Sequence, residues 1–148
     1  MKHMIAGVIA AATAISAGCR TAPAADREVE ASSSAEGLDV LDWNGPDYKR
    51  VHAFGAWRIA YLNDGPRFGE KNFSWIERHM KTDEAFVLLE GEATLVIGRD
   101  KQRVPMARNK IYNVRKGVWH QILMKPGAKS LIIENDDTSK DNTEYIRW

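Results

Sequence analysis

The most informative segment of this chain is residues 77–91, which read Glu77-Arg-His79-Met-Lys-Thr-Asp-Glu84-Ala-Phe-Val-Leu-Leu-Glu-Gly91. Glu77 and His79 are two positions apart, and residues at that spacing in an extended strand point to the same face. Trp75 continues the same alternation on the N-terminal side. We therefore expect a strand that directs a carboxylate and an imidazole into whatever the strand encloses.

The chain around this segment has the pattern of a β protein. No window outside the N-terminus keeps helical periodicity over three turns. The strand-like segments are bounded by Gly, Pro, Asn or Asp and cover residues 49–54, 57–62, 73–79, 85–89, 93–97, 104–106, 110–114, 118–123 and 130–134. The link Glu90-Gly91-Glu92 between two of them predicts a hairpin. Eight or nine short strands of this kind predict a single all-β barrel or sandwich over residues 38–148.

Two motifs in this region resemble those of the cupin superfamily. The first cupin motif is H-x-H, three or four residues, E, six residues and G, and this chain has Glu77-x-His79, four residues, Glu84, six residues and Gly91. The second is P-x-G-x-x-H, three residues and N, and the chain has Arg115-x-Gly117-x-x-His120, three residues and Met124. The closest resemblance is to small bacterial single-domain cupins whose first motif begins Glu-x-His. It implies a single antiparallel jelly-roll β-barrel.

The resemblance also implies a metal site. It assigns the ligands to Glu77, His79, Glu84 and His120. Two imidazoles with carboxylates suit a divalent first-row transition metal, and manganese, iron, zinc and nickel all fit. Glu77 stands where the family usually has His, so it is either a fourth ligand or a free catalytic base beside the metal. The alternative is a metal-free site in which these groups satisfy one another.

Three further residues are expected to line the pocket around this site. Trp75 shares the face of Glu77, Met124 shares that of His120, and Tyr112 is expected to enter from a neighbouring strand. An apolar mouth with a few convergent polar groups is the usual form of a small-molecule pocket. For each of the three taken alone, a place in the core is the simpler interpretation.

These features leave two functions open. The first is a metal-dependent enzyme acting on a small organic molecule, with isomerase, lyase and oxygenase chemistry unresolved. The second is a non-catalytic module that binds a small molecule or a sugar at the cell envelope. The formal net charge of the 148 residues is +1, with Lys and Arg scattered among acidic residues, so no nucleic-acid partner is expected. The oligomeric state is left open, with a homodimer among the options.

The N-terminus has the pattern of a secretion signal. A short basic start, an apolar run over residues 4–15 and small residues lead to Cys19, the only cysteine, which excludes a disulfide within the monomer. The segment Ser-Ala-Gly-Cys resembles a bacterial lipobox and implies that residues 1–18 are removed and Cys19 is lipidated. The protein would then contact the membrane only through this anchor, at the periplasmic face of the envelope. By analogy, Arg20 favours the outer membrane. The alternative is simple secretion into the periplasm.

Residues 19–37 are rich in Ala, Ser and Glu and are expected to form a flexible tether.

The lipid anchor gives a direct prediction. A Cys19→Ala protein is expected either to move to the soluble fraction or to remain as an uncleaved precursor, because the acceptor of the lipid is gone. Membrane fractionation with intact-mass measurement checks this. Fractionation and a mature mass identical to those of the wild type would show that the lipoprotein interpretation is wrong.

Overall fold

The computed structural model describes residues 30–32, 35–138 and 141–148, and within them the chain forms strands and short 3-10 helices but no α-helix. The strands are β1 (Glu30–Ser32), β2 (Val40–Asp42), β3 (Asp47–Phe54), β4 (Trp57–Asn63), β5 (Trp75–His79), β6 (Glu84–Glu90), β7 (Ala93–Ile97), β8 (Gln102–Pro105), β9 (Ile111–Val114), β10 (His120–Met124), β11 (Lys129–Asn135) and β12 (Thr143–Arg147). The 3-10 helices are η1 (Pro66–Phe68) and η2 (Glu70–Asn72). The predicted signal peptide and Cys19 lie outside the described residues. In the described part of the chain, no helix is long and apolar enough to cross a membrane.

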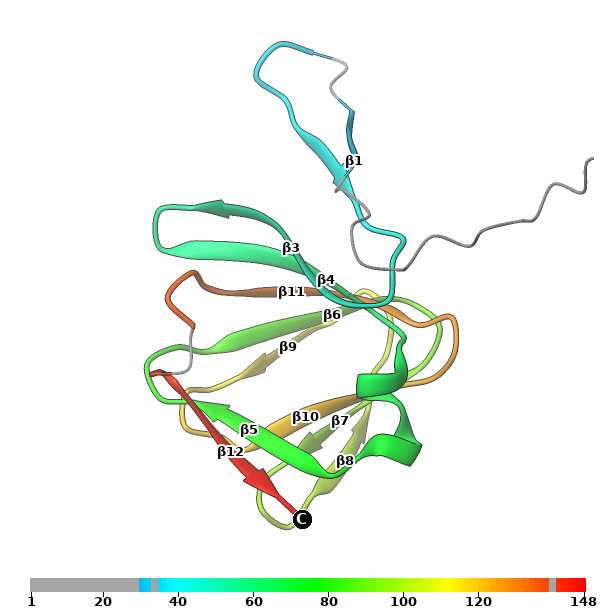
Figure 1. Cartoon of the computed structure of the whole chain (residues 1–148), viewed down its shortest axis with the longest axis vertical. Coiled ribbons are helices and arrows are strands. Elements are labelled where there is room, and N and C mark those ends of the chain that lie inside the picture. The colour runs from blue at the N-terminus through cyan, green and yellow to red at the C-terminus, as the bar shows by residue number, and fades with distance from the viewer. Residues whose placement is uncertain (1–29, 33–34, 139–140) are drawn as a thin grey trace, which may run out of the picture.

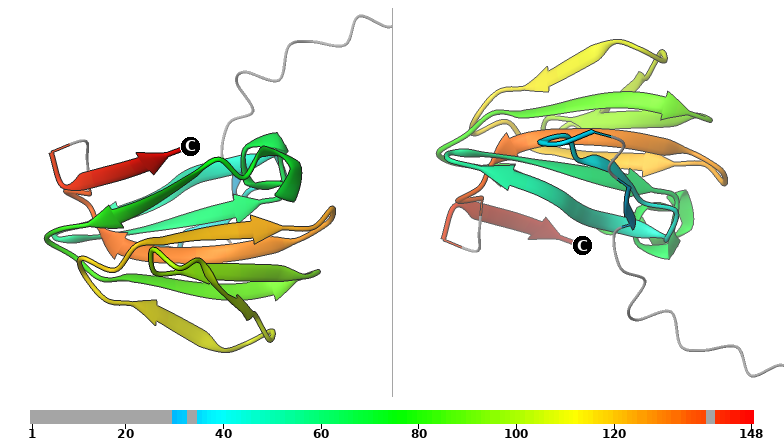
Figure 2. Two further views of the ribbon diagram at one scale, coloured as in Figure 1. Left: turned by 90° about the horizontal axis from the view of Figure 1, so that it is seen from below. Right: turned by 90° about the horizontal axis from the view of Figure 1, so that it is seen from above.

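Two five-stranded antiparallel sheets form the barrel. One has the order β12-β5-β10-β7-β8 and the other the order β3-β4-β11-β6-β9. Figure 1 shows the second sheet above the first, and Figure 2 shows the barrel from below and from above, with one sheet in front of the other. Neighbours within each sheet are mostly distant in sequence, as β11 is from β4 and β6. This arrangement confirms the predicted all-β fold and its form as a single antiparallel jelly-roll barrel.

Apolar side chains from both sheets fill the space between them. Phe86 and Leu88 on β6, Leu95 on β7 and Ile122 on β10 are each at most 2% exposed. Burying a large apolar side chain of this kind stabilises the fold by about 1.5–3 kcal/mol. Along β6 every second residue is buried, beginning with Glu84. The packing that buries Phe86 and Leu88 therefore also directs the Glu84 carboxylate into the barrel.

The prediction of a hairpin between residues 85–89 and 93–97 is wrong. β6 pairs with β9 and β11, whereas β7 pairs with β8 and β10 in the other sheet. Gly91 carries the chain across the corner with a φ of +68°, and a Cβ there would lie 2.7 Å from the Cα of Ala128. A short glycine-containing link serves a hairpin and a sheet-to-sheet crossing equally well. Only the long-range pairing of β7 with β10 and of β6 with β11 distinguishes the crossing from a hairpin.

Three parts of the fold were not predicted from the sequence. The strand β12 pairs with β5 over its whole length, with Thr143 opposite His79 and Tyr145 opposite Glu77. The helices η1 and η2 fill the connection before β5. The strand β1 pairs with β2 as a separate two-stranded sheet, so the described structure extends into the range expected as a tether.

Gly91 gives a test of the corner. Gly91→Ala should destabilise the fold because the new methyl group meets the backbone of Ala128. Gly55→Ala is the matched control, since Gly55 also has a positive φ, of +60°, but no heavy atom lies within 4 Å of the position that its new methyl group would take. The left-handed backbone alone costs an L-residue about 1–2 kcal/mol. At Gly91 only, overpacking against Ala128 should lower the free energy of unfolding by roughly 1–3 kcal/mol more. Urea unfolding measures both, and equal losses would contradict a tight corner.

Candidate metal centre

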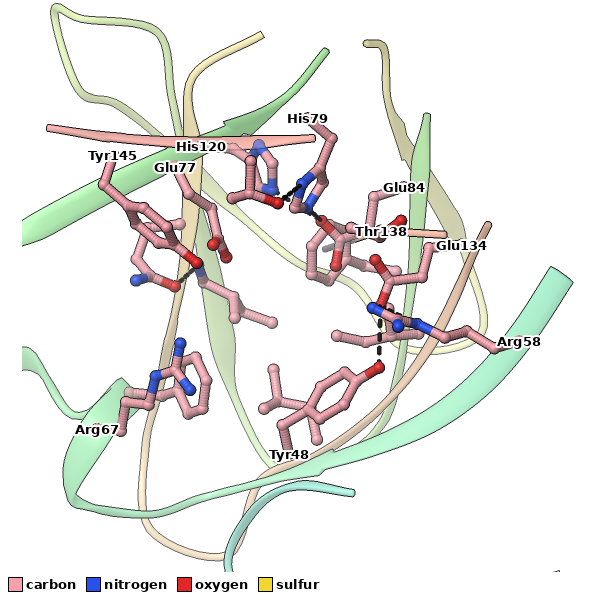
Figure 3. A pocket seen from close by; sticks show the side chains of 17 residues that line it. Tyr48, Arg58, Arg67, Glu77, His79, Glu84, His120, Glu134, Thr138 and Tyr145 are labelled. Carbon is pink, nitrogen blue, oxygen red and sulfur yellow. Dashed lines mark hydrogen bonds and ion pairs between the residues drawn. The ribbon is translucent and has the colours of Figure 1, made fainter. Parts of the chain in front are cut away.

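The side chains expected to share a site come from three strands and both sheets. Glu77 and His79 lie on β5, and His120 begins β10, the neighbouring strand of the same sheet. His120 pairs directly with Glu77 across the ladder. Glu84 begins β6 in the opposite sheet. Figure 3 shows all four side chains turned toward one cavity.

One carboxylate oxygen connects the two sheets at this point. Glu84 Oε2 lies 3.0 Å from His79 Nε2 and 2.8 Å from His120 Nε2. The three residues are between 2% and 6% exposed. Glu77 is less buried, and it offers a ligand atom within 4.8 Å of ligand atoms of His79 and His120. The structure thus brings together all four residues singled out in the sequence.

The outer nitrogens of both imidazoles are held by the fold. His120 Nδ1 lies 2.9 Å from the carbonyl oxygen of Val118, and His79 Nδ1 lies 2.9 Å from Thr143 Oγ1. A carbonyl oxygen only accepts, so His120 Nδ1 must carry the hydrogen and donate it. In a neutral His120 the Nε2 atom is then an acceptor that faces the acceptor Glu84 Oε2. This contact is favourable only when His120 is protonated, when Glu84 is protonated, or when both atoms bind one cation.

The donor set fits a transition metal. Nitrogen and oxygen donors lie about 2.0–2.2 Å from such an ion, so two donors at right angles around it are about 3 Å apart. The separations of 2.8 and 3.0 Å between Glu84 and the two histidines match this value. Histidine ligands of metals typically donate their other ring nitrogen to a carbonyl or a similar acceptor, as His120 does to Val118.

The two carboxylates of the centre differ in their electrostatics. Burial raises the pKa of Glu77, and the nearby Glu84 carboxylate raises it further. Burial of Glu84 also disfavours its charged form, but hydrogen bonds from His120 and His79 outweigh it and lower its pKa to about 2. Glu84 is therefore the permanent anion of the pair, and Glu77 is the carboxylate that accepts a proton more readily.

A third carboxylate at the site was missed in the sequence. Glu134 on β11 offers a ligand atom within 4.8 Å of those of His79 and Glu84. Its Oε1 accepts hydrogen bonds from Tyr48 Oη at 2.9 Å and from Arg58 Nη2 at 2.8 Å. Strand alternation could have indicated that Glu134 and Arg58 point inward. Glu134 shares a strand face with the buried Ile132, and Arg58 shares one with the buried Ala60 and Leu62.

The site opens into a cavity of about 250 Å³. Besides the four candidate ligands, its polar lining includes Tyr48, Arg58, Arg67, Glu134, Thr143 and Tyr145. The residues Trp75, Tyr112 and Met124, predicted to line the pocket, do not line this cavity. Trp75 and Met124 belong to the apolar core, and Tyr112 packs against it.

Two side chains that line the cavity pack against Trp75. Its ring lies 5.8 Å from that of Tyr145 and 6.4 Å from that of Phe68, measured between centroids, and both of these residues line the cavity. The alternation of β5 does direct Trp75 inward. The side chains that cover it come from η1 and β12, which the sequence pattern did not reveal.

Comparison with known proteins supports this fold. No protein-family model and no curated relative matches the sequence. A cupin-2 domain protein from Shewanella frigidimarina is 26% identical, with a TM-score of 0.51 over 63% of this chain and 84% of that protein. The nucleoside dehydratase Pac13 from Streptomyces is 9% identical, with a TM-score of 0.54 over 82% of this chain and 87% of that protein. The barrel is thus of the cupin type, and the likeness to the Shewanella protein supports a place in the cupin superfamily.

The hydrogen bonds of Glu84 predict how the stability of metal-free protein depends on pH. Burial opposes the charge on His120, but Glu84 outweighs it and raises the pKa of His120 above 6.5. The pair of Glu84 and His120 stabilises the fold fully when the pH is below the pKa that His120 has in the unfolded chain. This stabilisation is lost as the pH rises through the higher pKa that His120 has in the folded protein. The lowered pKa of Glu84 keeps the stabilisation intact until the pH falls below about 4.5, the ordinary value.

Chelator-treated protein should therefore melt at a lower temperature at pH 8 than at pH 6. Glu84→Gln removes the charged partner of His120 and should flatten the profile between these values. Differential scanning calorimetry of both proteins in chelator checks the difference. A decline of equal size in both would show that the pair between Glu84 and His120 does not form.

Proposed function

We propose that this chain is a metal-dependent enzyme of the cupin type that acts on a small organic molecule. In this proposal a divalent ion of manganese, iron, zinc or nickel is held by His79, Glu84 and His120. The observation that carries the proposal is the contact of one buried oxygen, Glu84 Oε2, with the Nε2 atoms of both histidines. Three donors that converge in this way at cation-binding distances, with one imidazole oriented from behind by a carbonyl oxygen, form a metal site with open positions.

The bound metal would supply Lewis acidity that polarises an oxygen atom of the substrate. The residues of the chain would do the rest. Thr143 and the Val118 carbonyl orient the two imidazoles, and the closed barrel limits the access of water to them. The small cavity restricts the substrate to a molecule below drug size, for which pockets of about 300–1,000 Å³ are typical.

We assign the proton-transfer role to Glu77. No hydrogen bond joins Glu77 to either histidine within the described residues, whereas Glu84 bonds both. Its raised pKa places it closer to neutral pH than an exposed carboxylate, which suits a general base. Glu77 would take a proton from the carbon next to a carbonyl group whose oxygen is polarised. In an isomerase it would return the proton to another atom of the substrate, and in a lyase it would give the proton to the leaving group as the bond to that group breaks. This favours an isomerase or lyase type of reaction. The Streptomyces neighbour is a dehydratase, and that reaction class is compatible with this role, although fold alone does not specify chemistry.

Metal content and activity test the proposal together. Protein grown in metal-replete medium should contain about one divalent ion per chain by elemental analysis, and His79→Ala and His120→Ala should lose it. His52→Ala is the matched control, because His52 lies on β3 outside the cavity. Glu77→Gln should keep the metal and lose about 10²–10⁴-fold in turnover, the usual contribution of a general base. Activity is measured on small hydroxy acids, keto acids and polyols.

The alternative outcomes separate the roles. Loss of metal in Glu77→Gln would make Glu77 a ligand and overturn its role as a base. Stoichiometric metal and tight binding of a panel compound without turnover would indicate a non-catalytic binding module. Absence of any divalent metal from the wild-type protein would contradict the proposed function.

A further inference from the structure

We infer that the substrate of this cavity carries a carboxylate, which Arg67 binds at the end of the cavity away from the metal centre. The inference rests on the proposed function, because it places the reacting end of the substrate at the metal. Figure 3 shows the Arg67 side chain reaching toward the cavity from the wall opposite His79 and Glu84.

Arg67 is held in place by aromatic rings rather than by a bonded anion. Its guanidinium lies 5.0 Å from the ring centroid of Trp75 and 5.1 Å from that of Phe68. Neither a hydrogen bond nor an ion pair joins its side chain to another described residue. Stacking on aromatic faces restrains the guanidinium and leaves its N–H donors available in the plane of the group. Arg67 is exposed and lines the cavity, so these donors are accessible to an acceptor group of a ligand.

The other cavity arginine shows the contrast. Arg58 donates to Glu134 Oε1 through Nε at 3.0 Å and Nη2 at 2.8 Å, so its charge is already matched by a buried carboxylate. Among the described residues, Arg67 has no carboxylate at such a distance. It lies in η1, away from the three carboxylates that gather around the metal centre. Glu77 feels the positive charge of Arg67 only through space, as a minor lowering of its pKa.

The charge balance of the filled cavity points to an anion. Glu77, Glu84 and Glu134 face two guanidinium groups, and a divalent ion at the centre turns the sum of these charges from negative to positive. A negative group of the substrate at the Arg67 end would offset this excess positive charge. A single guanidinium binds a carboxylate in a two-pronged geometry. A phosphoryl dianion is larger and more highly charged, and among the described residues neither a second free guanidinium nor a lysine lines the cavity to neutralise it. We therefore assign a carboxylate.

Three probes with the same 2-hydroxy acid end test this assignment. Malate carries a carboxylate at its far end, its 4-amide malamate carries a neutral group of equal size, and 3-phosphoglycerate carries a phosphoryl group. Binding is measured by calorimetry on the full chain loaded with Mn²⁺, and metal content is measured on the same samples. Malate should bind roughly 10- to 100-fold more tightly than malamate, the usual range for a hydrogen bond to a charged group.

Arg67→Gln should remove this preference, and Arg67→Lys should keep part of it. Arg99→Gln is the matched control, because Arg99 also stacks on an aromatic ring, that of Trp119, but does not line the cavity. It should bind the three probes as the wild type does. Thermal melts confirm that each variant is folded, and metal content should be the same in all four proteins.

Several results would overturn the inference. Equal binding of malate and malamate, or of neither at millimolar concentration, would exclude a carboxylate site at Arg67. A preference for 3-phosphoglycerate that Arg67→Gln abolishes would replace the carboxylate with a phosphoryl group. Absence of metal would contradict the proposed function alone, since the comparison of malate with malamate is repeated on chelated protein and judges Arg67 independently.

Discussion

The centre of this molecule depends on one shared hydrogen-bond acceptor, Glu84 Oε2, which meets the imidazoles of His79 and His120 inside the barrel. A buried carboxylate without partners would cost several kcal/mol or would take up a proton. Here the partners lie in the opposite sheet, so the buried carboxylate keeps these hydrogen bonds only while the two sheets are packed together. The apolar layer of Phe86, Leu88, Leu95 and Ile122 supplies that packing, and the polar centre is in effect supported by the core beside it.

The remaining polar groups divide into two sets with different surroundings. Glu134 is surrounded by donors from Tyr48 and Arg58, which orient it and match its charge. Glu77 lines the cavity and interacts with the Tyr145 hydroxyl of the neighbouring strand. One fold thus holds three carboxylates in three electrostatic settings: one shared by imidazoles, one neutralised by an arginine, and one beside a neutral hydroxyl. Such divergence among neighbouring acids is typical of sites that move protons.

The sequence predicted the parts of this structure that depend on local pattern. Alternation in residues 73–79 placed Glu77 and His79 on one inward face, and the resemblance to the two cupin motifs added Glu84 and His120 to the four groups that the fold brings together. What failed were features determined by tertiary pairing. The link at Gly91 has the local chemistry of a hairpin, and only β10 and β11 divert it between sheets. Trp75 points inward as predicted, yet Tyr145 and Phe68 cover it. Arg58 and Glu134 share strand faces with buried apolar residues, but alternation within each short strand does not reveal that the two strands pair and bring these charges together.

The pairing of β12 with β5 has a consequence for the order in which the site is assembled. His79 takes its hydrogen-bond partner, Thr143, from a strand 64 positions further along the chain, and Glu77 lies opposite Tyr145 on the same late strand. During synthesis, β5 emerges long before the strand that flanks it, so the imidazole that faces Glu84 lacks its outer support until the barrel is nearly complete. Contacts between such distant segments form late, because the loop between them must first close. The outer support of His79 is therefore completed only after β12 has emerged, and a metal ion would meet a finished binding site only from that point on.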